Sequence, residues 1–508
     1  MDMERLTPVE LAARRHWWIR FWVILAVVLL VLYWLVFENS YVVAYEDDRE
    51  HFLYGSIGSE TASGLPYWVF KALPKLYEKE LGPQGYRRFG FLYESPDADL
   101  PIGVSRRVVS GIERVWLNCS VCHVGTWRAA PGGETHYVYG APSNNLRLYA
   151  FIQFLRRIAV DNGFNADNLL QAINSEEVGG DLGPLDRALY RLVIVDRVRQ
   201  GLLDVRSQLD FLDRQHDWGP GRVDTFNPYK AIQFNFPMGP TEIDDLALNG
   251  SSDYPAVWQQ RPREGLQLHW DGNNTSVAER NLSAALGAGV TPITVDRERI
   301  HRVADWLWDL PAPPFPRPES IDQDRAAQGR ELFARYCADC HGMGGEAGYD
   351  YDVDRYPRLG KVVALERIGT DPGRWASYTR NFAAAQNLLY SGYPWRFSQF
   401  RKTGGYANHP LDGIWARSPY LHNGSVPTLR DLLEPSHGRP TVWLRGSDVY
   451  DFARVGYRAD GTGAAPEELF RYDTAVSGNS NRGHEGRGYG TDLSPAEKDA
   501  LVEYMKTL

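Results

Sequence analysis

Two pentapeptides of the pattern Cys-x-x-Cys-His constrain this chain more than any other feature. The first is CSVCH at residues 119–123, and the second is CADCH at residues 337–341. Together they use all four cysteines of the 508-residue chain, so no thiol remains for another purpose. This pattern is the attachment signature of c-type haem.

The chemistry of attachment requires this spacing. Two thiols three positions apart lie on one helical turn and can bond the two vinyl groups of one porphyrin, while the adjacent histidine is directed at the iron. The sequence therefore predicts two covalently bound haem c groups. The predicted attachment residues are Cys119, Cys122, Cys337 and Cys340, and the predicted proximal iron ligands are His123 and His341.

Other uses of paired cysteines fit the pattern less well. A zinc site with four cysteines does not need a histidine after each pair. A disulfide within Cys-x-x-Cys closes a short ring that is usually redox-active rather than structural. A thioredoxin-like site would have one such motif in a βαβ context, which the sequence does not suggest.

Charge and composition exclude some classes of protein. There are 55 Lys and Arg residues against 64 Asp and Glu residues, a formal net charge of −9 without long blocks of one sign. No basic stripe is present to replace phosphate counterions, so we expect no nucleic-acid partner. The hydrophobic content of 43% excludes a disordered chain.

An apolar run near the N-terminus predicts a membrane anchor. Residues 21–37 carry no charge and would cover roughly 25 Å as a helix, close to the ~30 Å of a hydrocarbon core. Arginines precede the run and acidic residues follow it, so the positive-inside rule predicts a cytoplasmic N-terminus. We expect a cytoplasmic segment at 1–18 and a single-pass signal anchor in the inner membrane at 19–38, with periplasmic haem domains. The alternative is a cleaved signal peptide.

Helical periodicity and proline content predict how the rest of the chain divides into domains. Residues 322–336 read as an amphipathic helix in which Gly329 allows another helix to approach, and residues 493–508 are its expected partner. The proline-rich segment 311–318 reads as a stiff linker. We therefore predict haem domains at 45–310 and 319–508. The predicted fold is mainly α, with two cytochrome c-like haem domains, long loops and one preceding transmembrane helix.

The sixth coordination position decides whether a haem transfers electrons or binds a substrate. For the second haem the candidates are His422, His409, His437, His484 and Met505. We favour His422, because an aromatic run meets a Gly- and Pro-rich turn there. For the first haem, His136, His216, Met238 and His269 have no convincing surroundings, so its distal side is expected to be open.

Further motifs support a family resemblance. Besides the two haem motifs, the chain has HWDG at residues 269–272 and PYLHNGS at residues 419–425. Over about residues 50–508 it resembles the di-haem cytochrome c peroxidase superfamily, which includes the MauG-type enzymes and the rubber-oxygenase (RoxA-like) branch. The resemblance implies that Trp270 lies between the haems and assists electron transfer, as a catalytic residue. It also implies that His422 is the distal ligand of the C-terminal haem.

One departure from the superfamily bears on the reaction. The peroxidases have a catalytic glutamate after the Trp-Asp-Gly motif, whereas residues 281–294 contain no carboxylate and Glu279 reads as a solvated helix position. This departure favours the oxygenase branch, in which the first haem binds dioxygen in an apolar pocket. The small residues around Ala284 and Ala288, however, do not suggest such a lining.

These observations favour a membrane-anchored periplasmic oxidoreductase that uses peroxide or dioxygen at the N-terminal haem and transfers electrons through the C-terminal haem. The expected partner is a small redox protein that donates or accepts electrons. The alternative is a non-catalytic electron-transfer subunit docked to a membrane respiratory complex.

Overall fold

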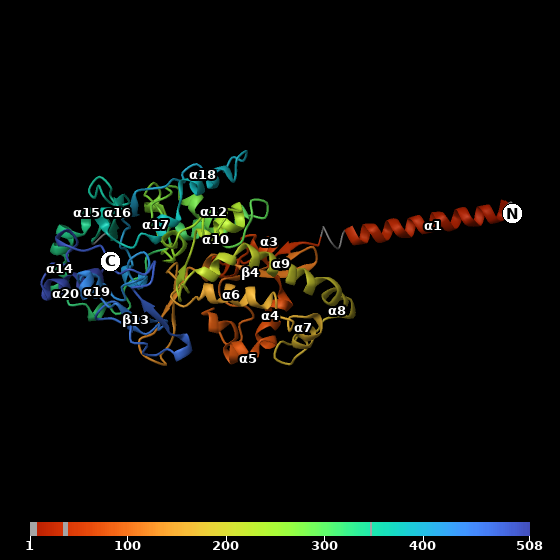
Figure 1. Cartoon of the computed structure of the whole chain (residues 1–508), viewed down its shortest axis with the longest axis horizontal. Helices are drawn as coiled ribbons and strands as arrows, with labels where there is room; N and C mark the ends of the chain where they lie inside the picture. Colours follow the sequence, from red (N-terminus) through yellow and green to blue (C-terminus); the bar gives the residue numbers. More distant parts are fainter. Residues whose placement is uncertain (1–7, 34–38, 346–347) are drawn as a thin grey trace.

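A computed structural model describes residues 8–33, 39–345 and 348–508. The body of the molecule combines short helices, small antiparallel sheets and long loops, and α1 (Pro8–Tyr33) projects from it (Figure 1). About 43% of the chain is helical and 12% is in strands. The prediction of a mainly α fold is therefore wrong, because seven small sheets are interspersed among the helices of the described residues.

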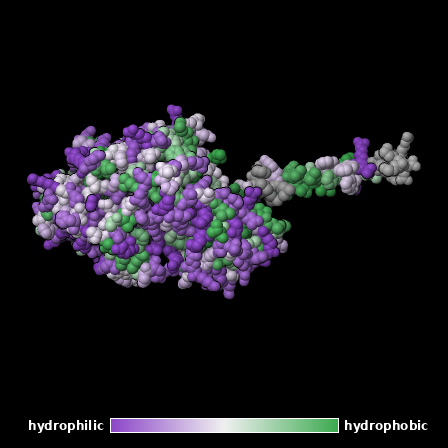
Figure 2. Space-filling view, in the orientation of Figure 1, coloured by the Kyte–Doolittle hydropathy of each residue, from purple (hydrophilic) through white to green (hydrophobic). Residues whose placement is uncertain are grey.

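The predicted transmembrane helix is also corrected. Among the residues that the structure describes, no helix is long and apolar enough to cross a membrane. Arg14, Arg15 and Arg20 occupy the first half of α1, and its uncharged remainder to Tyr33 is only about 20 Å long. Figure 2 shows the apolar side chains of this remainder. The end of the predicted span, residues 34–38, lies outside the described residues.

A four-stranded antiparallel sheet precedes the first haem motif. Its order is β1-β3-β4-β2, and a hairpin of β3 and β4 forms its centre. Ser110 and Gly111 both have positive φ, 51° and 77°, as a two-residue type I′ turn requires. β4 ends at Leu117, two residues before Cys119, so the sheet fixes where the motif begins. The strands are β1 (Tyr41–Val42), β2 (Leu65–Pro66), β3 (Val104–Val109) and β4 (Ile112–Leu117).

Short helices surround this sheet and form the N-terminal half. Figure 1 shows α4, α5 and α7 gathered on one side of the body and α10 and α12 near α17 and α18. The helices are α2 (Asp48–Tyr54), α3 (Ser59–Ser63), α4 (Tyr67–Leu76), α5 (Glu78–Leu81), α6 (Leu148–Ile158), α7 (Ala166–Ile173), α8 (Pro184–Leu189), α9 (Val195–Gln208), α10 (Asn227–Phe234), α11 (Asp245–Leu248), α12 (Val277–Gly287) and α13 (Arg297–Trp308).

In the C-terminal half, α14 and α20 cross as predicted. Gly329 in α14 packs so closely on α20 that an added Cβ would overlap the carbonyl oxygen of Ala500. Phe333 and Tyr504 pack beside this crossing, with ring centroids 5.1 Å apart. The helices of this half are α14 (Gln323–Tyr336), α15 (Ala338–His341), α16 (Leu365–Ile368), α17 (Gly373–Ser377), α18 (Arg380–Leu388), α19 (Leu429–Leu432) and α20 (Pro495–Met505).

The remaining strands form two-stranded antiparallel sheets. Their pairs are β5 with β6, β7 with β8, β9 with β10, β11 with β12, β13 with β16, and β14 with β15. The strands are β5 (Val124–Trp127), β6 (His136–Tyr139), β7 (Arg222–Val223), β8 (Ser252–Asp253), β9 (Met343–Gly345), β10 (Gly348–Asp350), β11 (Val362–Ala364), β12 (Gly405–Ala407), β13 (Val442–Arg445), β14 (Tyr450–Asp451), β15 (Gly456–Tyr457) and β16 (Phe470–Asp473).

The two halves share core and hydrogen bonds. Trp258 from the first half packs in one buried cluster with Trp415 and Phe333 from the second. Arg128 pairs with Asp448, and the Tyr457 hydroxyl donates to the carbonyl of Thr126 at 2.9 Å. The predicted domain boundaries and the linker at 311–318 stay predictions.

Candidate haem sites

The first haem motif is anchored by Asn118, which immediately precedes it. The Asn118 side chain accepts from the Ser120 amide at 3.0 Å, as an N-cap does, and donates to the carbonyl of Gly55 at 3.0 Å. The next residues form a short 3₁₀ turn, Cys119–Val121. This turn presents Cys119 and Cys122 on one local element, as attachment to one porphyrin requires.

The histidines of both motifs make the same hydrogen bond. Nδ1 of His123 donates to the backbone carbonyl of Pro255 at 3.0 Å, and Nδ1 of His341 donates to the carbonyl of His409 at 2.7 Å. A metal-ligating histidine usually donates its second ring nitrogen in this way, which fixes the tautomer and the ring orientation. In both motifs Nε2 is therefore the nitrogen left for the iron.

Burial holds these groups in the required protonation state. It lowers the pKa of His123 to about 4, with a smaller contribution from the positive charge of Arg280, and it also lowers the pKa of His341. Both imidazoles are therefore neutral at pH 7, which is the form that binds a metal. Burial raises the pKa of the Cys119 thiol to about 11 and that of Cys337 to about 12.

His484 is the histidine ring that contacts His341. The two ring centroids are 6.2 Å apart, with an interplanar angle of 47°. Two imidazoles that bind one metal ion from opposite sides have ring centres roughly 6 Å apart, because each metal–nitrogen bond is about 2 Å long. Burial and the nearby His341 lower the pKa of His484 to about 3, so it too is neutral. Sequence reasoning included His484 among five candidates but did not select it.

His422, the distal ligand favoured from the sequence, lies in different surroundings. Its ring stacks on Tyr406 at 4.2 Å, and its carbonyl accepts from the Asp253 amide at 2.9 Å. The side chain is buried, and its Nε2 has no hydrogen-bond partner among the described residues. Ligation by His422 stays a prediction, for which the unpartnered nitrogen is the supporting feature.

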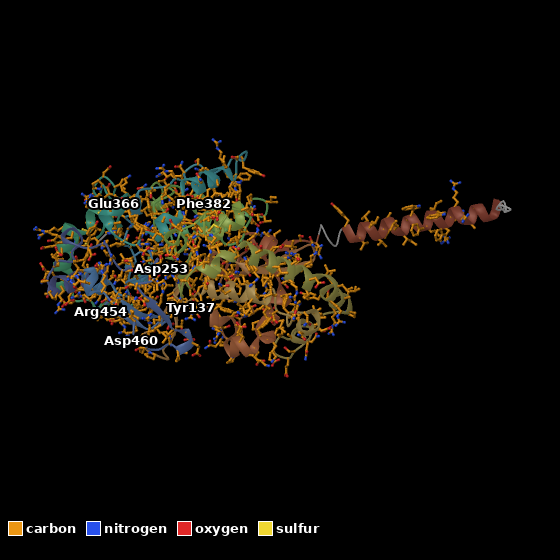
Figure 3. All side chains as sticks on the ribbon, in the orientation of Figure 1. Tyr137, Asp253, Glu366, Phe382, Arg454 and Asp460 are labelled. Carbon is orange, nitrogen blue, oxygen red and sulfur yellow. The ribbon has the colours of Figure 1, made fainter. Side chains whose placement is uncertain are left out.

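Trp270 occupies a central position. Its indole Nε1 donates to the carbonyl of Asp253 at 2.8 Å, and Asp253 lies near the middle of the body (Figure 3). On its other side, Trp270 meets the ring of His409 edge-on, with centroids 5.6 Å apart. The His409 ring is fixed, because its Nε2 donates to the carbonyl of His269 at 3.0 Å.

These contacts link Trp270 to the segments that hold the two motif histidines. Asp253 is two residues from Pro255, whose carbonyl holds His123. His409 provides the carbonyl that holds His341. Short backbone segments thus connect Trp270 to each motif, as expected for a side chain between two haems, although its electron-transfer role stays a prediction.

An aromatic cluster borders the first motif. It packs against Cys119 and includes Phe226, Tyr229, Tyr378 and Phe382. Sequence reasoning missed this lining because it examined only the small residues of α12, whereas the rings come from α10, α17, α18 and their flanks. No local pattern could have brought these segments together.

Glu279 has a structural role. Its carboxylate accepts from the backbone amides of Ser398 and Gln399, at 2.8 and 3.0 Å, and from the Asn274 side chain at 3.0 Å. It therefore anchors a loop from a partly exposed position of α12, in line with the solvated helix position that the sequence suggested. A carboxylate used in this way is poorly placed to exchange a proton with a bound peroxide.

Comparison with known proteins gives one family match and two relatives. Residues 405–444 match the family described as RoxA-like, cytochrome c-like. An uncharacterized protein of Sinorhizobium fredii, y4iM, is 34% identical over half of this chain, and the aligned region covers 64% of its own length. A second uncharacterized protein of the same species, y4iJ, is 27% identical over 83% of this chain and 84% of its own length.

The matched segment lies next to the second motif. It includes His409, whose carbonyl holds His341, and His422. The cysteine pairs, the neutral imidazoles and their carbonyl acceptors suit a covalently bound haem c. The family match supports a cytochrome c-type relationship and implies haem c binding.

Proposed function

We propose that this chain is a di-haem c-type cytochrome that acts as an oxidoreductase. A haem on His123 would be the reaction centre for dioxygen or peroxide, and a haem on His341 would exchange electrons with it through Trp270. The supporting observation is the repeated arrangement in which each motif histidine donates Nδ1 to a carbonyl on either side of Trp270. Haem c, when bound, supplies the redox-active iron for this chemistry.

A difference between the two sites supports the division of roles between them. His341 has a second imidazole, that of His484, at a distance suited to shared ligation. The ring beside His123 is that of Tyr254, with centroids 6.4 Å apart. Burial raises the pKa of Tyr254 well above its ordinary value, so its hydroxyl stays protonated and is a poor ligand. A closed site favours electron transfer, and an open one favours substrate binding.

The chain's own residues favour dioxygen over peroxide. Glu279 is the acidic residue nearest to the expected position of a peroxidase glutamate, and its oxygens already accept backbone and side-chain hydrogen bonds. The aromatic cluster beside Cys119 would exclude water from that side of the site. An apolar pocket suits a neutral diatomic ligand better than a peroxide that must lose or gain protons.

Counting haem per chain tests the cofactor assignment. Wild-type protein matured in an exporting host should contain two haem c groups, measured as the pyridine haemochrome against protein mass. The paired variants Cys119→Ser/Cys122→Ser and Cys337→Ser/Cys340→Ser should each retain one. Loss of both haems from either pair, without loss of fold by circular dichroism, would contradict two independent sites.

The second candidate function is that of a cytochrome that only transfers electrons. The distance between His341 and His484 favours a closed, electron-transferring haem at one of the two sites. Carbon monoxide separates the candidates. The proposal predicts one carbon monoxide per reduced chain, whereas two closed haems would bind none. We further propose a small redox protein as electron partner, and an oxidising compartment outside the cytoplasm, where c-type haems are attached.

A further inference from the structure

Arg280, near the start of α12, is a buried arginine that forms no ion pair with an aspartate or glutamate of the described residues. It is 8% exposed. Its Nε and Nη2 donate to Oδ1 of the neighbouring Asn281, at 3.2 and 2.9 Å. Within the part of the chain that the structure describes, its Nη1 has no hydrogen-bond partner. A guanidinium has five N–H donors, so most of the donor capacity of Arg280 is not used.

The charges near Arg280 do not neutralise it. Burial and the positive charge of Arg263 lower the pKa of Arg280 to about 10, and the opposing effect of Glu264 is smaller. Glu264 is exposed, and its carboxylate accepts from the Val277 amide at 2.9 Å. Arg280 therefore stays protonated at pH 7. A buried charge is costly unless an opposite charge and hydrogen bonds compensate it, so an anionic group beside Arg280 would stabilise the fold.

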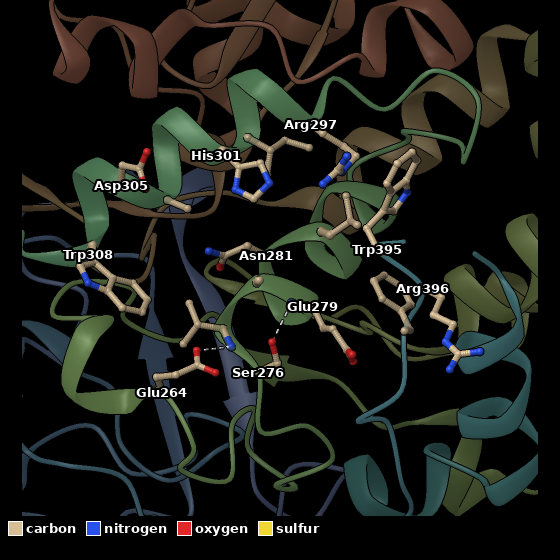
Figure 4. Close-up of a pocket in the computed structure, with 16 residues that line it drawn as sticks. Glu264, Ser276, Glu279, Asn281, Arg297, His301, Asp305, Trp308, Trp395 and Arg396 are labelled. Carbon is tan, nitrogen blue, oxygen red and sulfur yellow. Dashed lines mark hydrogen bonds between the residues drawn. The ribbon is translucent and has the colours of Figure 1, made fainter. Parts of the chain in front are cut away.

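The Arg280 side chain does not face the cavity between α12 and α13. Figure 4 shows the side chains of Glu279 and Asn281 at this cavity, whereas Arg280, between them in the sequence, is not part of its lining. Apolar residues that follow on α12 belong to the aromatic cluster that packs against Cys119. The anion that would pair with Arg280 is therefore expected in the interior, on the side of the first haem motif.

Hydrogen bonds connect Arg280 to the segment that holds His123. Asn281 donates from Nδ2 to Oε1 of Gln260 at 2.9 Å, and Gln260 donates from Nε2 to the carbonyl of Val257 at 3.1 Å. Val257 is two residues after the carbonyl that accepts from His123. The charge of Arg280 also acts at His123, where it adds to the effect of burial in lowering the pKa. Arg280 thus lies close to the site at which His123 would bind haem.

We propose that Arg280 binds a propionate of the haem on His123. Haem c carries two propionate carboxylates at one edge of its ring, and an arginine matches a carboxylate through two parallel N–H donors. The inference rests on the proposed function, because it requires a haem at the first motif. The contact would compensate the buried guanidinium and keep the propionate ionised. It would also tune the reduction potential of the N-terminal haem, which depends on the charges and hydrogen bonds around it.

The pH dependence of the reduction potential in Arg280→Gln tests this contact. Without its arginine, a buried propionate should have a raised pKa, because burial favours the neutral form of a carboxyl group. The potential of the N-terminal haem should then fall as the pH rises from about 5 to 8, more steeply than in the wild-type protein, because the propionate becomes negative in this range. Loss of the arginine charge should also favour the ferric state roughly tenfold. Potentiometric titration followed by electron paramagnetic resonance gives the potential of each haem from its own ferric signal.

Two further variants accompany Arg280→Gln. Arg280→Lys keeps the positive charge and should retain the pH dependence of the wild-type protein. Its ammonium cannot make two parallel contacts, so the propionate bending band in the resonance Raman spectrum should shift. Arg401→Gln is the matched control, because Arg401 is exposed while its amide donates to the carbonyl of Asn273 at 2.9 Å, close in the chain to Trp270. It should leave the pH dependence and the band unchanged.

Two results would overturn the proposal. The first is an Arg280→Gln protein that carries both haems and has the wild-type pH dependence of the potential. The second is an Arg280→Lys protein whose propionate band is the same as that of the wild type, and this result is decisive even if the glutamine variant does not fold. Failure of the proposed function would appear differently, as a wild-type protein without haem at Cys119 and Cys122 in the pyridine haemochrome count.

Discussion

Replacing Gly329 by alanine tests the close crossing of α14 and α20 beside the second haem motif. The new Cβ would overlap the carbonyl oxygen of Ala500 and lie 2.9 Å from Cβ of Tyr504, well inside the ~3.5–4.0 Å of a favourable carbon contact. Overpacking of this kind costs about 1–3 kcal/mol. The better helix propensity of alanine returns up to about 1 kcal/mol. We therefore expect a net loss of about 1–2 kcal/mol in the free energy of unfolding.

Gly201→Ala in α9 is the matched control. Gly201 is also inside a helix, but an added Cβ there has no neighbour within 4 Å, so alanine should stabilise the protein by about 0.5–1 kcal/mol. Urea unfolding of the holoproteins, followed by far-ultraviolet circular dichroism, gives both values. A Gly329→Ala variant that gains stability as Gly201→Ala does would refute the predicted helix contact.

Three further predictions concern the haem sites. The ring contact with His341 predicts that His484→Ala converts the C-terminal haem from low-spin to high-spin in the ferric absorption spectrum; conversion in His422→Ala and not in His484→Ala would instead bear out the ligand predicted from the sequence. Trp270→Phe should slow electron transfer between the haems severalfold in flash photolysis without loss of either haem, and an unchanged rate would exclude the bridge. Burial lowers the pKa of His409 to about 3, against about 6.5 when unfolded. Between these two pKa values His409 is protonated in the unfolded state and neutral in the folded state. The unfolding free energy therefore falls by about 1.4 kcal/mol for each pH unit as the pH drops from about 6.5 towards 3. His409→Gln should remove this contribution, so that the unfolding free energy of the variant depends less steeply on pH, by about 1.4 kcal/mol per pH unit. If urea titrations at pH 4–6 give the same pH dependence for the variant and the wild type, other groups cause it.

Local chemistry made some features predictable from sequence. The haem motifs were predictable because they are defined by the spacing of two cysteines and a histidine along the chain, which tertiary structure cannot alter. The α14–α20 crossing follows from periodicity, a small residue at the contact and the Ser494 cap, which forms a capping box with Glu497. The β3–β4 hairpin was also predictable, since β-branched residues surround Ser110 and Gly111. It was missed because the haem motifs led to the prediction of a mainly α fold.

Other features depend on how distant segments meet. His484 contacts His341 although four helices and eight strands of the described residues, α16–α19 and β9–β16, lie between them in the sequence. No spacing rule could therefore distinguish His484 from His422. The aromatic cluster beside Cys119 combines segments from both halves of the chain. The apolar N-terminal run is a contrasting case, because it resembles a membrane span in composition, yet no described helix is long and apolar enough to be one.

The electron paramagnetic resonance spectrum of the ferric holoprotein distinguishes a closed haem from an open one in the same sample. We expect two signals of equal weight, one from a low-spin haem held by His341 and His484 and one from a high-spin haem held by His123. Conversion of the low-spin signal in His484→Ala, with the high-spin signal retained, would support the assignment of each iron. Two low-spin signals in the wild-type protein would contradict an open reaction centre, and with it the proposed oxidoreductase.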